Sequence, residues 1–306
     1  MTTGLAAQRK VLKFDSTVSR VYVHRQSVAE VFLTDHLRLS EHEFAVGAQW
    51  PRAHELYRPT DGSYNILFYA ETLRQAAIYL AHRCYDVPLD HCFVMSEIDV
   101  QGLPFGVRVD DHAAEVSVDV RMSGLHYRDG QLARFRIELE FRIGGSRIGF
   151  GNGAAQILPP EVYKRLRWRH RRPDDVGAPI CGQPCAVPAT AELLPSNVVL
   201  GPRIGPSEWE LRVDDAHPVL FDHPSDHVPG ALLLEAICQA GRVLTQNRAT
   251  VVGLGATFRK YAELDRPVTV AACTDSSGKV STARVVFRQE SAEVAVGYVS
   301  FAESRT

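Results

Sequence analysis

Two long apolar runs stand out in the pattern of hydrophobic and polar positions along the chain. Residues 64–85 read YNILFYAETLRQAAIYLAHRCY, and residues 231–241, directly after a Pro-Gly pair, read ALLLEAICQAG. Each run predicts a helix with apolar residues on nearly every side, which is typical of a helix that is buried all round. Each predicted helix nevertheless holds one acidic residue, Glu71 in the first and Glu235 in the second. Because a buried carboxylate is costly unless a partner or a reaction needs it, both are candidate site residues.

Segments that alternate between apolar and polar positions flank each helix and predict antiparallel strands. In the first half we expect strands at residues 18–33 (whose second part could also be helical), the start of 44–59, 93–100, 115–122, 132–143 and 147–157. In the second half we expect them at residues 197–200, 209–213, 252–259, 268–273, 282–288 and 293–301. His24 and Arg25 are expected on an exposed face of the first strand, with a functional role as the alternative.

The two halves form an internal repeat. Both helices place Glu and Gln at matching positions with a spacing of four residues: Leu67, Glu71 and Gln75 in the first, and Ala231, Glu235 and Gln239 in the second. Ahead of the helices, the alignment places Pro51 over Pro218 and His54 over Phe221. One helix wrapped by an antiparallel sheet, twice, predicts an α+β fold of two repeats at residues 1–158 and 197–306, joined by a proline-rich linker at 159–196. The repeats would pack like two subunits of a dimer about an approximate two-fold axis.

Composition narrows the class of protein. With 306 residues, 45% of them hydrophobic and 23% charged, the chain suits a soluble globular protein of two domains or one fused pair. The net charge is −2, so no overall field recruits nucleic acid or a membrane. No apolar stretch has the form of a signal peptide or a membrane span. The six cysteines follow no disulfide framework, and Cys181 and Cys185 lack the Cys-x2-Cys spacing of a zinc knuckle. We expect a cytoplasmic protein with free thiols.

Two Asp-His pairs precede the second helix, within the sequence DHPSDHVPG. His223, Asp226 and His227 have the i, i+3, i+4 spacing that would converge on one face of a helix and could hold a metal. Pro224 and Pro229 disfavour a regular helix there, so we expect no metal ligand set.

Several segments resemble those of a known family. The Pro-Gly start of the second helix, with an acidic residue five positions after Gly230, is similar to the central helix of hotdog-fold acyl thioester enzymes. The segments VHRQSVAEVFLTD, PRAH, ETLRQ, DHPSDHVPG and FRKYAELDRP together resemble the A-factor biosynthesis (AfsA-type) γ-butyrolactone synthase family. The resemblance implies a tandem double hotdog packed as an intrachain pseudo-dimer, present as a monomer or homodimer. It also implies an acyltransferase that condenses a β-ketoacyl-acyl carrier protein thioester with dihydroxyacetone phosphate, without a metal or other cofactor.

The resemblance further implies two unlike sites, because in dimeric hotdog enzymes a loop histidine of one subunit faces the helix carboxylate of the other. One site would place His54, with Arg52 nearby, opposite Glu235. The other would place three loop residues opposite Glu71: His223, Asp226 and His227. A carboxylate whose pKa is raised by burial could act as a general base, although pairing with an arginine would make it structural instead.

Other residues are candidates for binding substrate. Free N–H groups near Gly230, at the start of the second helix, could hold the oxyanion of a thioester. Four basic residues could bind a phosphate: Arg74, Arg242, Arg259 and Lys260. The two repeat glutamines, Gln75 and Gln239, are further candidates for binding substrate.

A basic run, Lys164–Arg172, lies in the predicted linker. It could be a solvated segment, a docking surface for an acidic acyl carrier protein, or a contact for nucleic acid; we expect no nucleic-acid partner, because one basic run does not make such a protein. Two other functions stay open. One is a hotdog dehydratase or thioesterase, and the other is a non-catalytic acyl- or lactone-binding regulatory protein.

Overall fold

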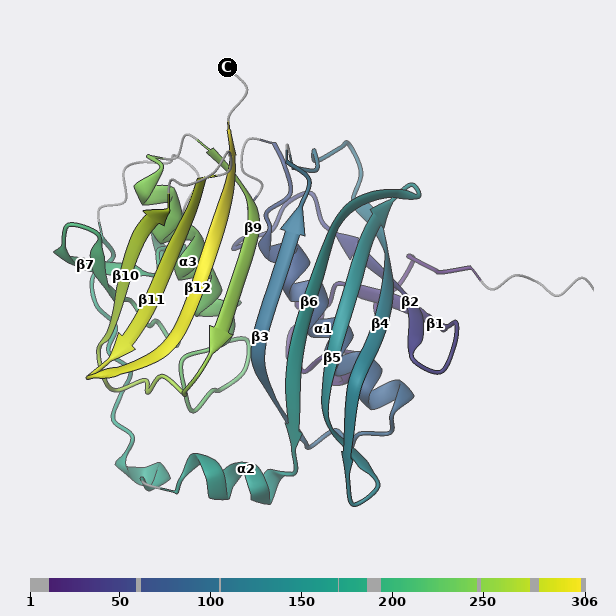
Figure 1. Cartoon of the computed structure of the whole chain (residues 1–306), viewed down its shortest axis with the longest axis horizontal. Coiled ribbons are helices and arrows are strands. Elements are labelled where there is room, and N and C mark those ends of the chain that lie inside the picture. The colour runs from purple at the N-terminus through teal and green to yellow at the C-terminus, as the bar shows by residue number, and fades with distance from the viewer. Residues whose placement is uncertain are drawn as a thin grey trace, which may run out of the picture.

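The strands of the protein form one continuous sheet. A computed structural model describes residues 11–58, 62–104, 106–169, 171–185, 194–246, 249–275 and 281–303. In this described part, twelve strands join in one sheet, and α1 (Leu67–Cys84) and α3 (Gly230–Leu244) lie side by side on one face of it (Figure 1).

Each repeat supplies six of these strands. The first repeat contains β1 (Leu33–Arg38), β2 (Glu43–Trp50), β3 (Cys92–Gly102), β4 (Ala114–Arg128), β5 (Gln131–Ile143) and β6 (Ser146–Leu158). The second contains β7 (Leu200–Gly205), β8 (Glu208–Leu211), β9 (Ala249–Phe258), β10 (Val268–Asp275), β11 (Ser281–Gln289) and β12 (Ala292–Glu303).

The order of the strands shows the symmetry of the two repeats. The order is β1-β2-β4-β5-β6-β3-β9-β12-β11-β10-β8-β7. Read outward from the middle, both halves have the same order, so a pseudo-two-fold axis passes between β3 and β9. These two strands pair antiparallel from Glu97 opposite Thr257 to Gln101 opposite Gly253. The predicted architecture, one helix and one antiparallel sheet repeated twice and packed like a dimer, is confirmed.

The two central helices press closely onto the sheet. In β6, a Cβ added at Gly151 would lie 3.1 Å from the side chain of Leu73 in α1, and Gly297 of β12 similarly leaves room for Ile237 of α3. The helices are therefore buried along most of their length. As a result, the mid-helix carboxylates Glu71 and Glu235 are only 4% and 1% exposed.

The prediction of a strand at residues 18–33 is wrong. This segment forms two 3-10 turns, Arg20–Val23 and Val28–Glu30, and β1 begins only at Leu33. It packs on α1, and Arg25 is 7% exposed instead of lying on a solvent-facing strand. The physical reason is a tertiary ion pair, because the Arg25 guanidinium reaches the buried carboxylate of Glu71 at 2.8 Å.

The connection between the repeats carries a helix, α2 (Pro160–Arg167), and two short 3-10 helices at Pro173–Asp175 and Pro195–Asn197. Figure 1 shows α2 running below both halves of the sheet. Part of the predicted linker, residues 186–193, and His170 of the basic run lie outside the described residues. Among the helices of the described part, none has the length and apolar character needed to cross a membrane.

Candidate active site between the repeats

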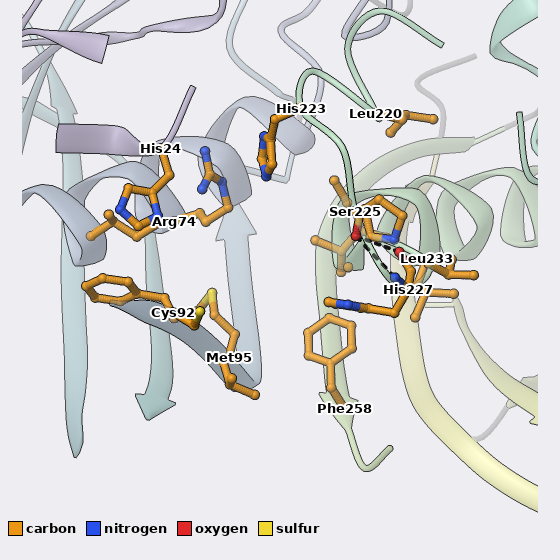
Figure 2. A pocket seen from close by; sticks show the side chains of 18 of the residues that line it. His24, Arg74, Cys92, Met95, Leu220, His223, Ser225, His227, Leu233 and Phe258 are labelled. Atoms are coloured by element: carbon orange, nitrogen blue, oxygen red, sulfur yellow. Dashed lines mark hydrogen bonds between the residues drawn. The ribbon is translucent and has the colours of Figure 1, made fainter. Parts of the chain in front are cut away.

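A cavity of about 740 Å³ lies between α1 of the first repeat and the loop and helix start of the second, residues 223–231. This volume is in the range of small-molecule sites. Figure 2 shows His24, Arg74 and His223 on one side of the cavity, and Ser225 and His227 on the other. The residues predicted opposite Glu71, namely His223, Asp226 and His227, all line this cavity together with Glu71.

Glu71 anchors two arginines in the cavity wall. Its Oε1 lies 2.8 Å from Nη2 of both Arg25 and Arg74, and its Oε2 accepts from Nε of Arg74 at 2.9 Å. Burial favours a higher pKa for Glu71, but the charges of Arg25 and Arg74 outweigh burial and lower the pKa from 4.5 to about 2. The expectation of a raised pKa is wrong for Glu71. Its carboxylate is ionised and a poor general base near neutral pH.

The first Asp-His pair joins two segments. The two oxygens of Asp222 accept the backbone N–H groups of Gln26 and Ser27 at 2.6 and 2.9 Å, which ties the loop to the segment that carries Arg25. His223 Nδ1 lies 3.6 Å from Asp222, too far for a hydrogen bond. Burial and the nearby arginine charges lower the pKa of His223 below 6.5, so its ring is neutral at pH 7.

The second Asp-His pair has the geometry of a general base. His227 Nδ1 lies 2.6 Å from Asp226 Oδ1, and the Tyr163 hydroxyl donates to both Asp226 oxygens at 2.9 and 3.0 Å. Burial opposes ionisation, but the hydrogen bonds from His227 and Tyr163 lower the pKa of Asp226. An ionised Asp226 accepts the Nδ1 proton of His227, which leaves Nε2 as the basic nitrogen. Within the described ranges, no hydrogen bond engages this Nε2, and the ring lines the cavity.

The start of α3 presents backbone donors to the same cavity. Pro229 is extended (φ −60, ψ 141), and no side chain caps the helix. The N–H groups of Gly230 and Ala231 have no hydrogen-bond partner among the described residues, and both residues line the cavity. In α1, by contrast, the Asn65 side chain accepts the N–H of Leu67 at 3.0 Å. Of these two helix starts, therefore, only that of α3 leaves backbone N–H donors that could bind an oxyanion in the cavity.

Glu235 occupies the equivalent position in α3 but has a different environment. Its Oε1 accepts from Gln239 at 2.6 Å, while its Oε2 is buried without a hydrogen-bond partner in the described part of the chain. Burial raises the pKa of Glu235 from 4.5 to about 7, and the charge of Arg242 opposes this only in part. Glu235 does not line the 740 Å³ cavity.

The two repeat glutamines bind backbone in the same way. Gln75 accepts the N–H of Phe32 and donates to the carbonyl of Glu30, at 2.9 and 2.7 Å. Gln239 repeats both bonds with the backbone of Val199 and Asn197, at 3.0 and 2.7 Å. Both amides are therefore occupied in joining each helix to its own repeat.

The predicted alignment of His54 with Phe221 is wrong by four residues. His54 and His217 are equivalent, because Nδ1 of each accepts the N–H groups two and three residues further along the chain. His54 Nε2 lies 3.3 Å from Glu30, and His217 Nε2 lies 3.1 Å from Asn197. The loops differ in length, which hides this register in the sequence. His54 does not line the cavity, and its Nε2 pairs with Glu30.

Three of the predicted basic residues line the cavity: Arg74, Arg259 and Lys260. The Arg259 guanidinium pairs with Glu293. Arg52 and Arg242 are not among the lining residues; Arg52 donates from Nε to a loop carbonyl at 2.9 Å. Of these three, Arg74 is the one that is anchored by a deeply buried carboxylate, that of Glu71.

The metal alternative has no geometric support in the Asp-His loop. In the described part of the chain, a group of three ligand atoms within 4.8 Å of one another occurs at Asp110, Asp111 and His112, which are exposed. Cys181 and Cys185 are free thiols.

The comparison with known sequences places the chain in a family. A family model described as the A-factor biosynthesis hotdog domain matches residues 6–159 and 193–302. The chain belongs to this AfsA family. One relative, from Streptomyces virginiae, is 40% identical over 262 residues, which are 84% of this chain and 87% of the relative. Another, from Streptomyces coelicolor, is 33% identical over 281 residues, 89% and 88% of the two chains. Both relatives are named 2-oxo-3-(phosphooxy)propyl 3-oxoalkanoate synthase.

Solved structures share the fold of this AfsA-family chain. The 12:0-ACP thioesterase from Umbellularia californica matches with a TM-score of 0.52 at 12% identity and covers 85% of this chain and 98% of that one. An acyl-ACP thioesterase from Bacteroides thetaiotaomicron matches with a TM-score of 0.51 at 10% identity and covers 84% and 97%. At such identities the likeness shows the fold alone. Together with the two-part family match, it confirms the double hotdog.

The basic run of this AfsA-family chain is partly buried. Arg167 is 7% exposed, pairs with Glu263 at 2.8 Å and donates to the backbone carbonyl of Asp226 at 2.6 Å. Arg171 pairs with Glu263 and Asp265. The interpretation as a wholly solvated segment is wrong, because these arginines fasten the linker to the second repeat.

Sequence reasoning missed Tyr163 and underrated Arg25. Tyr163 lies 63 residues from Asp226, and Arg25 lies 46 residues from Glu71. The motif VHRQSV contained a signal for Arg25, but its amphiphilic pattern also fitted a strand. Nothing in the sequence around Tyr163 distinguishes it from an ordinary surface tyrosine.

Proposed function

We propose that the chain is an acyltransferase of γ-butyrolactone, butenolide or furan-type signal biosynthesis. It transfers a β-ketoacyl group from a carrier-protein thioester to a hydroxyl of dihydroxyacetone phosphate and releases a phosphorylated β-ketoacyl ester. One observation carries this proposal: a single cavity joins a histidine with a free Nε2, an uncapped helix start and an anchored arginine. The relatives' name, which describes a phosphooxypropyl oxoalkanoate, supports the nature of the product.

His227 acts as the general base in this mechanism. Its Nε2 takes the proton of the substrate hydroxyl as that oxygen attacks the carbonyl carbon of the thioester. Ionised Asp226 holds the imidazole in the required tautomer and stabilises the imidazolium that forms, as the aspartate of a catalytic triad does. Tyr163 keeps Asp226 in place from α2.

The start of α3 stabilises the tetrahedral intermediate. The N–H groups of Gly230 and Ala231 bind the oxyanion while the new C–O bond is complete and the C–S bond is intact. The C–S bond then breaks, and the proton on His227 passes to the departing thiolate. The acyl chain lies against the apolar lining, which includes Phe93, Met95 and Phe258.

A product assay with purified protein tests the proposal. The protein is mixed with a β-ketoacyl thioester, first carrier-bound and then as a small thiol mimic, with and without dihydroxyacetone phosphate. Released thiol and product mass are measured. Thiol release that depends on dihydroxyacetone phosphate, with a phosphorylated ester formed, is the expected result. Thiol release that ignores dihydroxyacetone phosphate would indicate a thioesterase, and acyl binding without release would indicate a binding protein.

The base is tested by His227→Gln, which should reduce ester formation by at least about 100-fold. The matched control is His112→Gln. His112 forms the same neighbouring Asp-His hydrogen bond, 2.7 Å to Asp111, but it is exposed and outside the cavity. Equal activity in the two variants would contradict the assignment of His227.

A further inference from the structure

The cavity wall opposite His227 carries an excess of positive charge. Arg25 and Arg74 share a single carboxylate, Glu71, so two guanidinium charges against one carboxylate leave one positive charge. Arg25 and Glu71 are 5% and 4% exposed at their side chains, whereas Arg74 is 23% exposed. The buried pair thus holds Arg74 at the surface of the cavity.

Arg74 has a free edge that faces this space. Its Nε and Nη2 donate to Glu71, and Nη2 also donates to the carbonyl of Val23 at 3.2 Å. Its Nη1 has no hydrogen-bond partner among the described residues. Figure 2 shows the Arg74 guanidinium between the rings of His24 and His223. His24 Nε2 is already hydrogen-bonded to His82 Nε2 at 2.9 Å. A neutral imidazole carries one N–H, so Arg74 and His223 are the side chains that can donate toward this point.

Other charges near this corner are already engaged. Asp222 is 1% exposed at its side chain, both of its oxygens accept backbone N–H groups, and it is not a lining residue. Asp226 is held by His227 and Tyr163 across the cavity. Asp90, which also lines the cavity, accepts from His91 at 2.9 Å.

We propose that Arg74 and His223, together with the charge of Arg25 and here termed the arginine corner, bind the phosphate monoester group of the second substrate. The identity of that substrate rests on the proposed function, whereas the binding of a phosphate anion does not. Arginine suits this role because its planar fork can bind two phosphate oxygens at once. Glu71 is then a positioning residue that holds Arg74.

The placement suits the proposed chemistry. In dihydroxyacetone phosphate the free hydroxyl and the phosphate ester lie at opposite ends of a three-carbon chain. The arginine corner and His227 lie on opposite sides of the cavity (Figure 2). A phosphate bound at the corner therefore leaves the hydroxyl directed toward the base.

Calorimetric titration of the full chain with inorganic phosphate, dihydroxyacetone phosphate and dihydroxyacetone tests this proposal. Both phosphates should bind and compete with each other, and dihydroxyacetone should not displace inorganic phosphate. Arg74→Gln should weaken phosphate binding by at least about tenfold, the worth of one charge-assisted hydrogen bond. Arg83→Gln removes the same charge from the same helix outside the cavity and should change affinity by less than about twofold.

Three outcomes would overturn the arginine corner: no phosphate binding by the wild type, equal losses in Arg74→Gln and Arg83→Gln, or a loss with Lys260→Gln that Arg74→Gln does not show. If Arg74→Gln fails to fold, His223→Gln, in the loop, should still weaken phosphate binding by a few fold.

The acyltransferase proposal and the arginine-corner proposal can fail separately. Phosphate binding without ester formation contradicts the acyltransferase but supports the corner. Ester formation in which Arg74→Gln leaves the KM for dihydroxyacetone phosphate unchanged contradicts the corner alone.

Discussion

Replacing Glu235 by glutamine should stabilise the protein, and the gain should grow as the pH rises. Glu235 is 1% exposed, and its Oε2 is without a partner in the described part of the chain. Glutamine has nearly the same shape as protonated glutamate and keeps an oxygen that can accept from Gln239. It removes only the ability to ionise, which is costly in this apolar place.

The size of the effect follows from the pKa of Glu235, which burial raises from 4.5 to about 7. The folded protein binds this proton more tightly than the unfolded chain does. The contribution of Glu235 to stability is therefore fully present below pH 4.5 and is lost as the pH rises through about 7. The gap between the two pKa values corresponds to about 3 kcal/mol in the free energy of unfolding, since one pH unit is worth about 1.4 kcal/mol.

The same substitution at Glu71 provides an internal control of opposite sign. Arg25 and Arg74 overcome the effect of burial and lower the pKa of Glu71 to about 2. Its contribution to stability is present above pH 4.5 and is lost as the pH falls through about 2. Glu71→Gln leaves Arg25 buried without its counter-charge and should cost about 3–5 kcal/mol at neutral pH.

Urea unfolding of the wild type and both variants at about pH 5 and about pH 8.5 measures these differences. The stability of Glu235→Gln relative to wild type should rise by about 2–3 kcal/mol across this interval. If the stability difference between Glu235→Gln and the wild type were the same at both pH values, the reasoning for Glu235 would be refuted. A Glu71→Gln variant as stable as the wild type would refute the ion-pair account of Glu71.

Two further substitutions test the network between α2 and the Asp-His loop. Asp226→Asn should lower kcat by at least about 100-fold with little change in the KM of the thioester, because the amide cannot stabilise an imidazolium at His227. Steady-state kinetics measure both constants. Arg167→Met removes a side chain that is 3% exposed and leaves Glu263 with only its more distant arginine, Arg171 at 3.4 Å, so the free energy of unfolding should fall by about 2–4 kcal/mol. The exposed neighbour Arg165, changed in the same way, should leave stability within about 0.5 kcal/mol of the wild type in the same unfolding experiment.

Much of the fold was predictable because its determinants are local and periodic. The apolar run at residues 64–85 contains the whole of α1, Leu67–Cys84, and the Pro-Gly signal marks the start of α3 at Gly230. The register of the repeat was also correct in the helices, where Glu71 with Gln75 and Glu235 with Gln239 make matching hydrogen bonds of 2.6 Å. Loops carry no such period, which is why His54 was aligned with Phe221 instead of His217.

The candidate site was predictable only in part. The motif DHPSDHVPG marked the loop that lines the cavity, because adjacent Asp-His pairs and a Pro-Gly helix start have a local sequence signature. It did not distinguish the roles of the two pairs. Asp222 binds the backbone of Gln26 and Ser27, whereas Asp226 binds Tyr163 of α2, and both contacts join segments far apart in the sequence.

The sequence by itself determined that two buried helices of the same pattern each carry a glutamate, since helical periodicity and repetition can be read along the chain. Tertiary structure alone decided that the two carboxylates differ, with a pKa of about 2 at Glu71 and about 7 at Glu235. The pKa of a buried carboxylate depends on which charges other segments bring within a few ångströms. Arg25 comes from 46 residues away in the sequence to lie 2.8 Å from Glu71, whereas the carboxylate of Glu235 is hydrogen-bonded to Gln239.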